Sequence, residues 1–426
     1  RSRAPIQTVA DRISGWFVPL VLAISVLTFI VWYVTGPAPR FGHALLNAIS
    51  VLIIACPCAL GLATPMSIMV GTGRGAREGV LVRNAEALQA LDKVDTLVVD
   101  KTGTLTEGHP RLIGLDVTEG WQDTEVLRLA ASVEAQSQHP LAQAVVRALK
   151  DRQGDPAPVS DFASQPGLGI SGTVDGHQVV IGNAERLKQA GADTTPLEAT
   201  ATARRKGGAG VMFVAIDGKL AGLIAVADPL RADTQATLAA LHADGLRIVM
   251  LTGDNETTAN AVAKAAGHIA EIHAGLKPQD KADIIRRLEA SGARVAMTGD
   301  GVNDAPALAA ASVGIAMGTG TDVAIESAGI TLAHGSLGAL VRARMLAHAT
   351  MRNIRQNLAF SFLFNGIGIP VAAGALYPVF GMLLSPMIAG AAMALSSVTV
   401  VTNALRLGKE PVAARRPTDP HHTGSI

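Results

Sequence analysis

The stretch VDTLVVDKTGTLTEG, residues 94–108, decides the fold of the central part of this 426-residue chain. Its first half is a β-rich run that ends at Asp100, and its second half is a polar loop containing Thr-Gly-Thr. A carboxylate at the tip of a strand, followed by a loop of backbone donors, is suited to attack a phosphoryl group and to cradle its oxygens. We therefore predict Asp100 as a nucleophile, with Lys101 and Thr102 in the same site.

Three further runs, LRIVMLTGD (246–254), RVAMTGDG (294–301) and VGIAMG (313–318), are also β-rich and end in turns. Helical patterns lie between them, and this alternation predicts a doubly wound α/β domain with its site at the carboxyl ends of the strands. Oxygen ligands there suit Mg²⁺, while a hydroxyl and a lysine can clamp phosphate oxygens. A single Asp at a strand end can equally be a structural cap. The predicted site adds Thr252, Gly253, Asp254, Lys281, Asp300, Asn303 and Asp304.

A second domain interrupts this pattern. The segments GLGISGTVDGHQVVIGN (167–183) and AGVMFVAIDGKLAGLIAV (209–226) are typical of β-hairpins, and a helix is predicted before them at 124–150. The string GLGISG does not open a helix after a strand, so we reject a dinucleotide-binding fingerprint.

Apolar segments flank the central region. Hydrophobic residues make up 49% of the chain and charged residues only 17%, a composition that predicts membrane spans. A membrane span needs roughly 20 residues, and the segments 13–34, 44–70, 358–375 and 382–401 are predicted as four spans. Basic residues cluster on the side of the central region, which predicts that it is cytoplasmic. Buried helices of a soluble protein are the alternative. A net charge of +1 argues against a nucleic-acid partner.

The sequence IIACPCALGLATP, residues 53–65, holds the two cysteines of the chain, which are too few for a disulfide framework. Pro57 interrupts helical hydrogen bonding at membrane depth, and a broken membrane helix is typical of a binding site. Two thiolates select Cu(I), Ag(I) or another thiophilic ion, so Cys56 and Cys58 are predicted metal ligands. Cysteines also pack as small hydrophobic side chains, which is the structural alternative.

Residues 357–405 contain no charged side chain. Zn²⁺ or Cd²⁺ would be expected to recruit an intramembrane carboxylate, whereas thiolates with a thioether suit monovalent copper. The predicted Cu(I) ligands from this region are Asn365, Met393 and Ser397, although methionine also fills apolar cores readily.

The motifs DKTGTLTEG, TGD, KPQDK (277–281) and TGDGVNDAPAL (298–308) together resemble the phosphorylation domain of P-type ATPases, which is of haloacid-dehalogenase type. This resemblance implies an aspartyl-phosphate at Asp100 and Mg²⁺ held by Asp100, Asp300 and the Thr102 carbonyl. The inserted segments SQHPLA (137–142), GLGISG and IGN (181–183) resemble the heavy-metal branch. The residues that this likeness assigns to ATP are Glu134, His139, Gly167, Gly169, Gly182 and Asn183.

The last apolar segments, with MALSSVTVVTN at 393–403, resemble the copper and silver branch. Phe364 stands where that branch usually has Tyr, which leaves the choice between copper and silver open. The branch also has further spans and an actuator domain with a Thr-Gly-Glu loop, and no such string occurs in these 426 residues. We therefore expect the chain to be the C-terminal core of a longer pump.

The predicted fold is a haloacid-dehalogenase-like, Rossmann-type phosphorylation domain with an inserted α+β nucleotide-binding domain and α-helical transmembrane segments. Its predicted parts are two membrane helices and a stalk (1–93), the phosphorylation domain (94–112 and 223–340), the nucleotide-binding domain (113–222), two membrane helices (341–408) and a disordered tail (409–426). A histidine pair in that tail, His421 and His422, can bind metal or be merely solvated.

The predicted function is ATP-driven export of Cu(I), using ATP and Mg²⁺, across a plasma or inner membrane. A cytoplasmic chaperone or thiol pool is the expected copper donor, and the lipid bilayer is a partner. The alternatives are a silver, zinc or cadmium pump, a membrane-anchored phosphatase, and an inert nucleotide- and metal-binding fragment.

Overall fold

The computed structural model describes residues 5–56, 58–137 and 140–409, and it forms two compact units. One unit contains the chain up to Val94, the short segment Gly329–His334 and the chain from Ala339 onward. The other contains Asp95–Ala328 and Gly335–Gly338. His139 and residues 410–426, which the sequence assigned to nucleotide binding and to a tail, lie outside the described residues.

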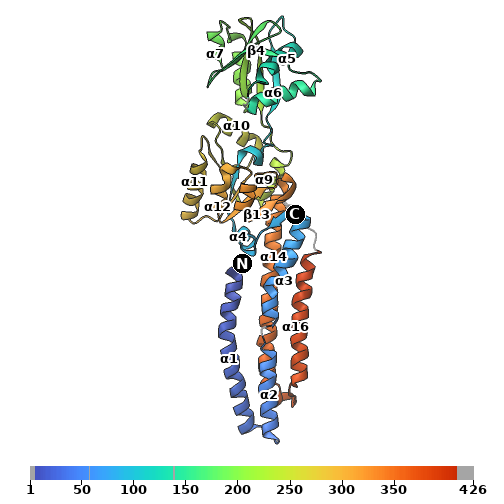
Figure 1. Cartoon of the computed structure of the whole chain (residues 1–426). Helices are drawn as coiled ribbons and strands as arrows, with labels where there is room; N and C mark the ends of the chain where they lie inside the picture. The colour runs from blue at the N-terminus through green and yellow to red at the C-terminus, as the bar shows by residue number, and fades with distance from the viewer. Residues whose placement is uncertain (1–4, 57, 138–139, 410–426) are drawn as a thin grey trace, which may run out of the picture. The chain divides into compact units, whose positions relative to one another are not determined.

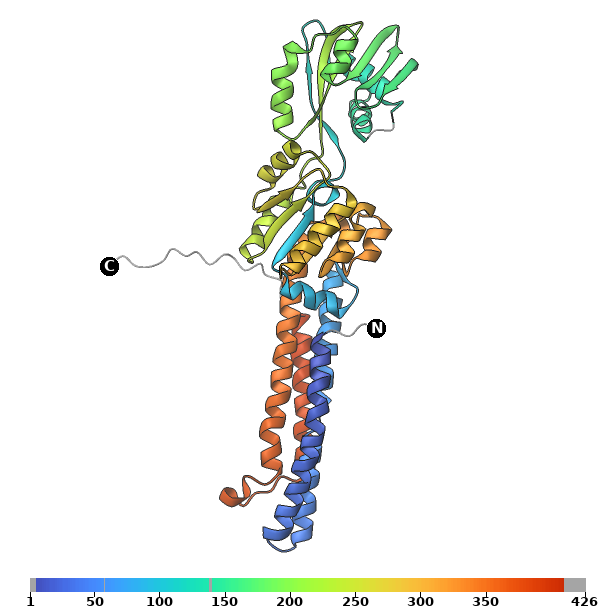
Figure 2. The same ribbon diagram turned by 90° about the vertical axis from the view of Figure 1, so that its left-hand side faces the viewer.

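The first unit is built from long apolar helices that run alongside one another (Figures 1 and 2). Among the described residues, three segments are long and apolar enough to cross a membrane, namely Gly15–Thr35, Arg40–Arg77 and Pro386–Leu407. The second of these is broken, because α2 ends at Ile54 and α3 begins at Cys58. The helices are α1 (Pro5–Thr35), α2 (Arg40–Ile54), α3 (Cys58–Arg77), α14 (Gly338–Ala372), the short α15 (Tyr377–Phe380) and α16 (Pro386–Leu407).

The predicted span 358–375 lies mostly in α14, which ends at Ala372, and Gly374 with φ +97° turns the chain. This helix is not among the three segments of the described residues that are long and apolar enough to cross a membrane, so the fourth span stays a prediction. The predicted span 382–401 is also shifted, because α16 begins at Pro386 after a capping Ser385 and continues to Leu407.

A small cap completes the first unit. The strands β1 (Val80–Val82) and β13 (Ile330–Leu332) pair in antiparallel fashion, and α4 (Ala85–Lys93) follows β1. Asn84 caps α4 by accepting a hydrogen bond from the Ala87 amide, which fixes where that helix starts.

A parallel sheet forms the first half of the second unit. Its strand order is β12-β11-β2-β9-β10, and every strand is parallel to its neighbour. Residues of β2, β11 and β12 are buried throughout, as expected for a parallel sheet covered by helices on both faces. The strands are β2 (Thr96–Asp100), β9 (Arg247–Leu251), β10 (Glu271–His273), β11 (Val295–Gly299) and β12 (Val313–Met317); the helices are α9 (Thr234–Ala243), α10 (Glu256–Ala266), α11 (Pro278–Ala290), α12 (Ala305–Ala310) and α13 (Asp322–Ser327).

The inserted region forms an antiparallel sheet with the order β3-β8-β7-β6-β5-β4. Alternate residues of its strands face two different cores, because side chains along a strand point to opposite faces. In β7, Val214 packs with α5 and α6, whereas Phe213 packs with α7 and α8. The elements are β3 (Arg111–Val117), α5 (Asp123–Glu134), α6 (Pro140–Asp151), β4 (Val159–Gln165), β5 (Gly169–Val174), β6 (His177–Gly182), α7 (Ala184–Gln189), α8 (Glu198–Lys206), β7 (Gly210–Ile216) and β8 (Lys219–Ala227).

Both predicted hairpins are confirmed. Two-residue Asp-Gly turns join β5 to β6 and β7 to β8, and all four turn residues have positive φ, which matches the twist of a hairpin. The single helix predicted at 124–150 is wrong, because the structure has two helices, α5 and α6. A proline disfavours helical geometry in the residue that precedes it, and α6 begins at Pro140.

Candidate functional site

The candidate site lies at one edge of the parallel sheet, where several strands end. Asp100 is the last residue of β2, Thr252 follows β9, and Asp300 follows β11. Because these strands are parallel and in register, with Asp100 beside Leu251, their carboxyl ends deliver the three side chains to one place.

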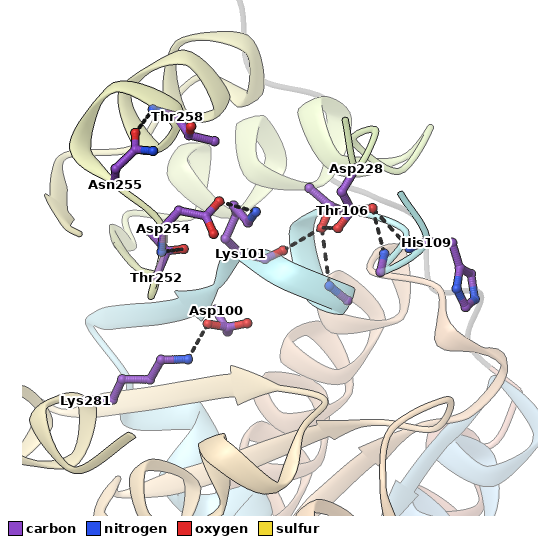
Figure 3. Close-up of polar contacts among 12 residues, drawn as sticks. Asp100, Lys101, Thr106, His109, Asp228, Thr252, Asp254, Asn255, Thr258 and Lys281 are labelled. Carbon is purple, nitrogen blue, oxygen red and sulfur yellow. Dashed lines mark hydrogen bonds and ion pairs between the residues drawn. The ribbon is translucent and has the colours of Figure 1, made fainter. Parts of the chain in front are cut away.

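Lys281 is the centre of the charge network. From the first turn of α11, its Nζ donates to Asp100 Oδ1 at 2.5 Å, as Figure 3 shows. The same Nζ donates to Asp304 Oδ1 at 2.7 Å. All three side chains are nearly inaccessible, with 8%, 7% and 3% of their surface exposed for Lys281, Asp100 and Asp304. One ammonium group thus serves two buried carboxylates, and negative charge is left over.

A third carboxylate joins this pair. Oxygen atoms of Asp100, Asp300 and Asp304 lie within 4.8 Å of one another. Gly103 has φ +70°, and a Cβ atom there would lie 1.7 Å from Asp300 Oδ2, so the loop fits against Asp300 only with glycine. Clustered carboxylate oxygens with surplus negative charge are the donor set that Mg²⁺ prefers, so the residues fit this ion.

Burial dominates the electrostatics of the site. Burial, followed by the nearby Asp304 charge, raises the pKa of Asp100 to about 7, although Lys281 opposes the shift. The same two causes, burial first and Asp304 second, raise the pKa of Asp300. Burial lowers the pKa of Lys281, but the two aspartates outweigh it, so the net pKa of Lys281 is raised and it stays charged.

The remaining predicted residues border this centre. Lys101 Nζ contacts Asp254 Oδ2 at 2.5 Å, and the Asp254 amide donates to the buried Thr252 hydroxyl at 3.1 Å (Figure 3). Gly253 is exposed between them. Thr102 is exposed with an extended backbone, and Asn303 is exposed one residue before buried Asp304.

Sequence reasoning missed a group of residues after β8. Asp228 accepts hydrogen bonds from the Thr106 hydroxyl at 2.5 Å and from the amides of Gly108 and His109 at 2.9 and 3.2 Å. Arg231 donates to two carbonyl groups in the loop after Asp100. The signal was present in the sequence, because ADPLRAD places a carboxylate directly after an apolar strand.

The structure brings together four of the residues predicted for ATP. Asn183 caps α7, and its Nδ2 donates to the Gly167 carbonyl at 3.2 Å. Gly169 and Gly182 are paired across β5 and β6; a Cβ at Gly169 would lie 2.1 Å from the Ile181 carbonyl oxygen. Glu134 ends α5, which packs on β5, and burial raises its pKa to about 7. Since Gly169 opens a strand, the rejection of a dinucleotide fingerprint holds.

The cysteines lie at the break between α2 and α3. The structure joins Cys56 and Cys58 in a disulfide with their Cα atoms 5.5 Å apart, whereas the sequence predicted thiolates. One residue separates them in the sequence, and they lie on the two sides of the break between α2 and α3. A disulfide offers no thiolate, so a soft-metal site at this position requires the reduced pair.

The other predicted copper ligands lie on α14 and α16. Asn365 and Ser397 are half-buried, and Met393 packs against an apolar cluster that includes Ala55, next to Cys56. A polar network also links α14 to α3 and α16: Ser67 on α3 donates to Asn353, the Asn357 amide donates to Ser67 at 3.1 Å, and the Asn403 amide on α16 donates to Asn357 at 2.8 Å.

Similarity to known proteins identifies the family of this chain. Residues 94–312 match the haloacid dehalogenase-like hydrolase family. The chain is 60% identical over 407 residues to the silver-exporting P-type ATPase of Salmonella typhimurium and 57% identical over 407 residues to the copper-exporting P-type ATPase of Legionella pneumophila. Each match covers 96% of this chain and, respectively, 49% and 55% of the relative. The chain belongs to the heavy-metal P-type ATPases. It spans about half the length of the curated relatives that it matches.

Solved structures of this family agree with the fold. A zinc-transporting PIB-type ATPase in its E2.Pi state has a TM-score of 0.83 at 36% identity, covering 95% of this chain and 65% of the other. The catalytic domain of the CPx-ATPase CopB-B has a TM-score of 0.50 at 31% identity and covers 64% of this chain and 98% of that one. This heavy-metal P-type ATPase is thus a membrane protein with a haloacid-dehalogenase-like phosphorylation domain, a nucleotide-binding insert and apolar helices able to cross a membrane.

Proposed function

We propose that this heavy-metal P-type ATPase uses ATP to export copper(I) and that Asp100 carries the phosphoryl group. The observation that supports this most strongly is the joint presence of two centres in one chain. One is the buried Asp100-Lys281-Asp304 network, and the other is a cysteine pair at a broken membrane helix.

The reaction at Asp100 is a displacement at phosphorus. A carboxylate oxygen of Asp100 forms a bond to the γ-phosphorus of ATP, the bond to the bridging oxygen breaks, and ADP leaves with that electron pair. Lys281 keeps Asp100 in place and offsets negative charge. Thr252 and the loop amides after Asp100 would contact phosphate oxygens. Lys101, held by Asp254, adds a positive charge beside the loop.

Magnesium is assigned to Asp100, Asp300 and the Thr102 carbonyl, where it would neutralise charge on the transferred phosphate. ATP is assigned to the surface formed by Glu134, Gly167, Gly169, Gly182 and Asn183. At Gly169 and Gly182 the space that a Cβ atom would take is filled by neighbouring backbone, because it would lie 2.1 Å from the Ile181 carbonyl oxygen and 2.3 Å from the Leu168 carbonyl oxygen. Their close packing requires glycine, which explains why larger residues are excluded there.

Copper(I) is proposed as the transported ion because Cys56 and Cys58 in reduced form, with Met393, are soft ligands in a region without carboxylates. Delivery from a cytoplasmic chaperone or thiol pool fits a monovalent, thiophilic ion. The second candidate is silver(I), which the same donors bind; the 60% identical relative is a silver exporter.

Labelling with ³²P tests this function. The chain, in a membrane and under reducing conditions, is incubated with [γ-³²P]ATP and Mg²⁺, with Cu(I), Ag(I), Zn²⁺ or no metal. We expect acid-stable label that is stimulated by Cu(I) or Ag(I) but not by Zn²⁺, and that is lost in Asp100→Asn. Hydrolysis of simple phosphate esters without a metal response would favour a phosphatase instead. Stimulation by Zn²⁺ alone would favour a divalent-metal pump.

A further inference from the structure

The segment Asp228–Asp233, with the sequence DPLRAD, follows β8 and takes no part in the chemistry proposed above. It nevertheless makes hydrogen bonds in two directions. On one side lies the loop after Asp100, and on the other lies the start of α14, the helix that runs for 35 residues into the apolar region.

Contacts with the phosphorylation loop are dense. Asp228 receives three hydrogen bonds, from Thr106, Gly108 and His109, as Figure 3 shows. The Arg231 guanidinium donates to the Gly103 carbonyl at 2.6 Å and to the Thr104 carbonyl at 3.1 Å. Main-chain bonds from Glu107 to Pro229 and from Arg231 to Leu105 complete the attachment. The loop that receives the phosphoryl group is therefore fastened to this segment.

Contacts with the start of α14 come from the same segment. Arg231 Nη1 donates to the Gly335 carbonyl at 3.0 Å. Asp233 Oδ2 accepts from the Ser336 hydroxyl at 3.0 Å and from the Gly338 amide at 2.8 Å. Gly338 is the first residue of α14, so Asp233 provides both a hydrogen-bond cap and a negative charge at a helix N-terminus, where both are favourable.

These contacts are rigid and closely packed. The planar Arg231 guanidinium donates hydrogen bonds to the carbonyl groups of Gly103, Thr104 and Gly335. Because this group is rigid, a movement of the loop displaces it more directly than it would displace a flexible ammonium group. Gly103 and Gly335 both have positive φ and lie against neighbours, since Cβ atoms there would come within 1.7 Å of Asp300 and 2.7 Å of Thr319. A close-packed contact of this kind shifts as a unit rather than yielding gradually.

We propose that Asp228–Asp233 is a coupling latch that ties the state of the phosphorylation loop to the N-terminal end of α14. Arg231 and Asp233 are its positioning residues. The latch rests on the proposed function, because it gives phosphoryl transfer at Asp100 a path to α14, the helix that contains most of the predicted span 358–375. A change in the loop moves Arg231, and through Arg231 and Asp233 it reaches the first turn of α14.

Hydrogen exchange of the chain in detergent micelles tests the latch without depending on copper. Mg²⁺ with beryllium fluoride serves as the phosphoryl analogue at Asp100, and exchange is followed by mass spectrometry in peptides from 101–108 and 335–342. We expect slower exchange in both peptides, by about fivefold or more at 335–342, because that amide network tightens.

Four variants separate the latch from folding. Asp233→Ala and Arg231→Ala are expected to keep the response at 101–108 but lose it at 335–342. Asp233→Asn retains an oxygen acceptor and Arg231→Lys retains one charged donor, so both should recover part of the response. The matched controls are Asp283→Asn and Arg286→Ala, which break an exposed pair on α11 and should behave like the unmodified chain.

The outcomes are distinct. A response at 101–108 with none at 335–342 in the unmodified chain overturns the latch and leaves the proposed function intact. An undiminished response at 335–342 in Asp233→Ala and Arg231→Ala also overturns it. No response at 101–108 contradicts phosphoryl binding at Asp100, and the latch fails together with the proposed function.

Discussion

The proposed phosphorylation site around Asp100 and the helix break at Cys56 and Cys58 depend on different interactions. Around Asp100, three carboxylates and a lysine are buried together, and their charges and hydrogen bonds hold one another. Around Cys56 and Cys58, the helices carry no charge between residues 357 and 405, and the opening is an interruption of helix geometry. Hard oxygen ligands suit the proposed phosphate and Mg²⁺, whereas soft sulfur ligands suit the proposed monovalent metal.

The two sites should differ in how they tolerate substitutions. Removing one member of the charged network leaves another charge buried without a partner, which is costly. Removing a sulfur from the break removes a ligand but leaves no charge behind. We therefore expect changes near Asp100 to affect both stability and activity, and changes at the cysteines to affect only the response to metal.

Asp100→Asn should have the largest effect. The amide retains the shape and a hydrogen-bonding oxygen but is not a nucleophile, so ³²P labelling from ATP should fall by roughly 10³-fold or more. ATP binding, measured with a fluorescent analogue, should persist. The control Asp283→Asn, at an exposed pair on α11, should label normally. Residual acid-stable label in Asp100→Asn would assign the phosphoryl group to another residue.

Lys281→Met should come next. It leaves Asp100 and Asp304 buried without their shared cation, so we expect a loss of about 3–5 kcal/mol in stability and a fall of roughly 10²-fold in labelling. Urea unfolding and labelling measure the two effects. Lys264→Met on α10, which is exposed, is the matched control. Unchanged stability would show that Lys281 does not neutralise this pair.

The cysteine pair should respond to redox state. The reduced chain should bind Cu(I) in competition with a chromophoric chelator, and oxidation to the disulfide or Cys56→Ser with Cys58→Ser should weaken binding by roughly 10²-fold. Met69→Ala removes an exposed sulfur from the same helix and should change nothing. Equal Cu(I) affinity in the oxidised and reduced chains would place the metal elsewhere.

Glu134 should give the smallest effect, through pH. Its pKa is raised by burial to about 7, so the folded state holds a proton that the unfolded state has already lost. Stability should therefore fall as pH rises from about 4.5 to about 7, by at most about 3 kcal/mol. Glu134→Gln should flatten this slope, and the exposed Glu125→Gln on the same helix should keep it. A slope that survives in Glu134→Gln would assign it to other groups.

The sequence predicted that Asp100 and Asp300 lie close together, because each follows an apolar strand directly. Asp100 and Asp300 each end such a run, and parallel strands bring their ends together. Both Asp-Gly hairpins were equally visible, because that dipeptide suits turns with positive φ at both positions. In these cases the local pattern and the packing demand the same structure.

Other features were hidden because they depend on distant partners. Nothing near Asp233 reveals that it caps Gly338, which lies 105 residues further along the chain. The division of the predicted 124–150 helix and the early end of α14 at Ala372 depend on local breaks that hydrophobicity alone does not mark. The disulfide between Cys56 and Cys58 likewise depends on how the broken helix turns, and not on composition.

One measurement tests the central claim that the two centres work together. The reduced chain and its Cys56→Ser/Cys58→Ser variant are titrated with Cu(I), and bound copper and ³²P label at Asp100 are measured in the same samples. We expect the label to rise with copper occupancy in the chain and to stay at its metal-free level in the variant. Label that is the same with and without bound copper, in both proteins, would contradict it.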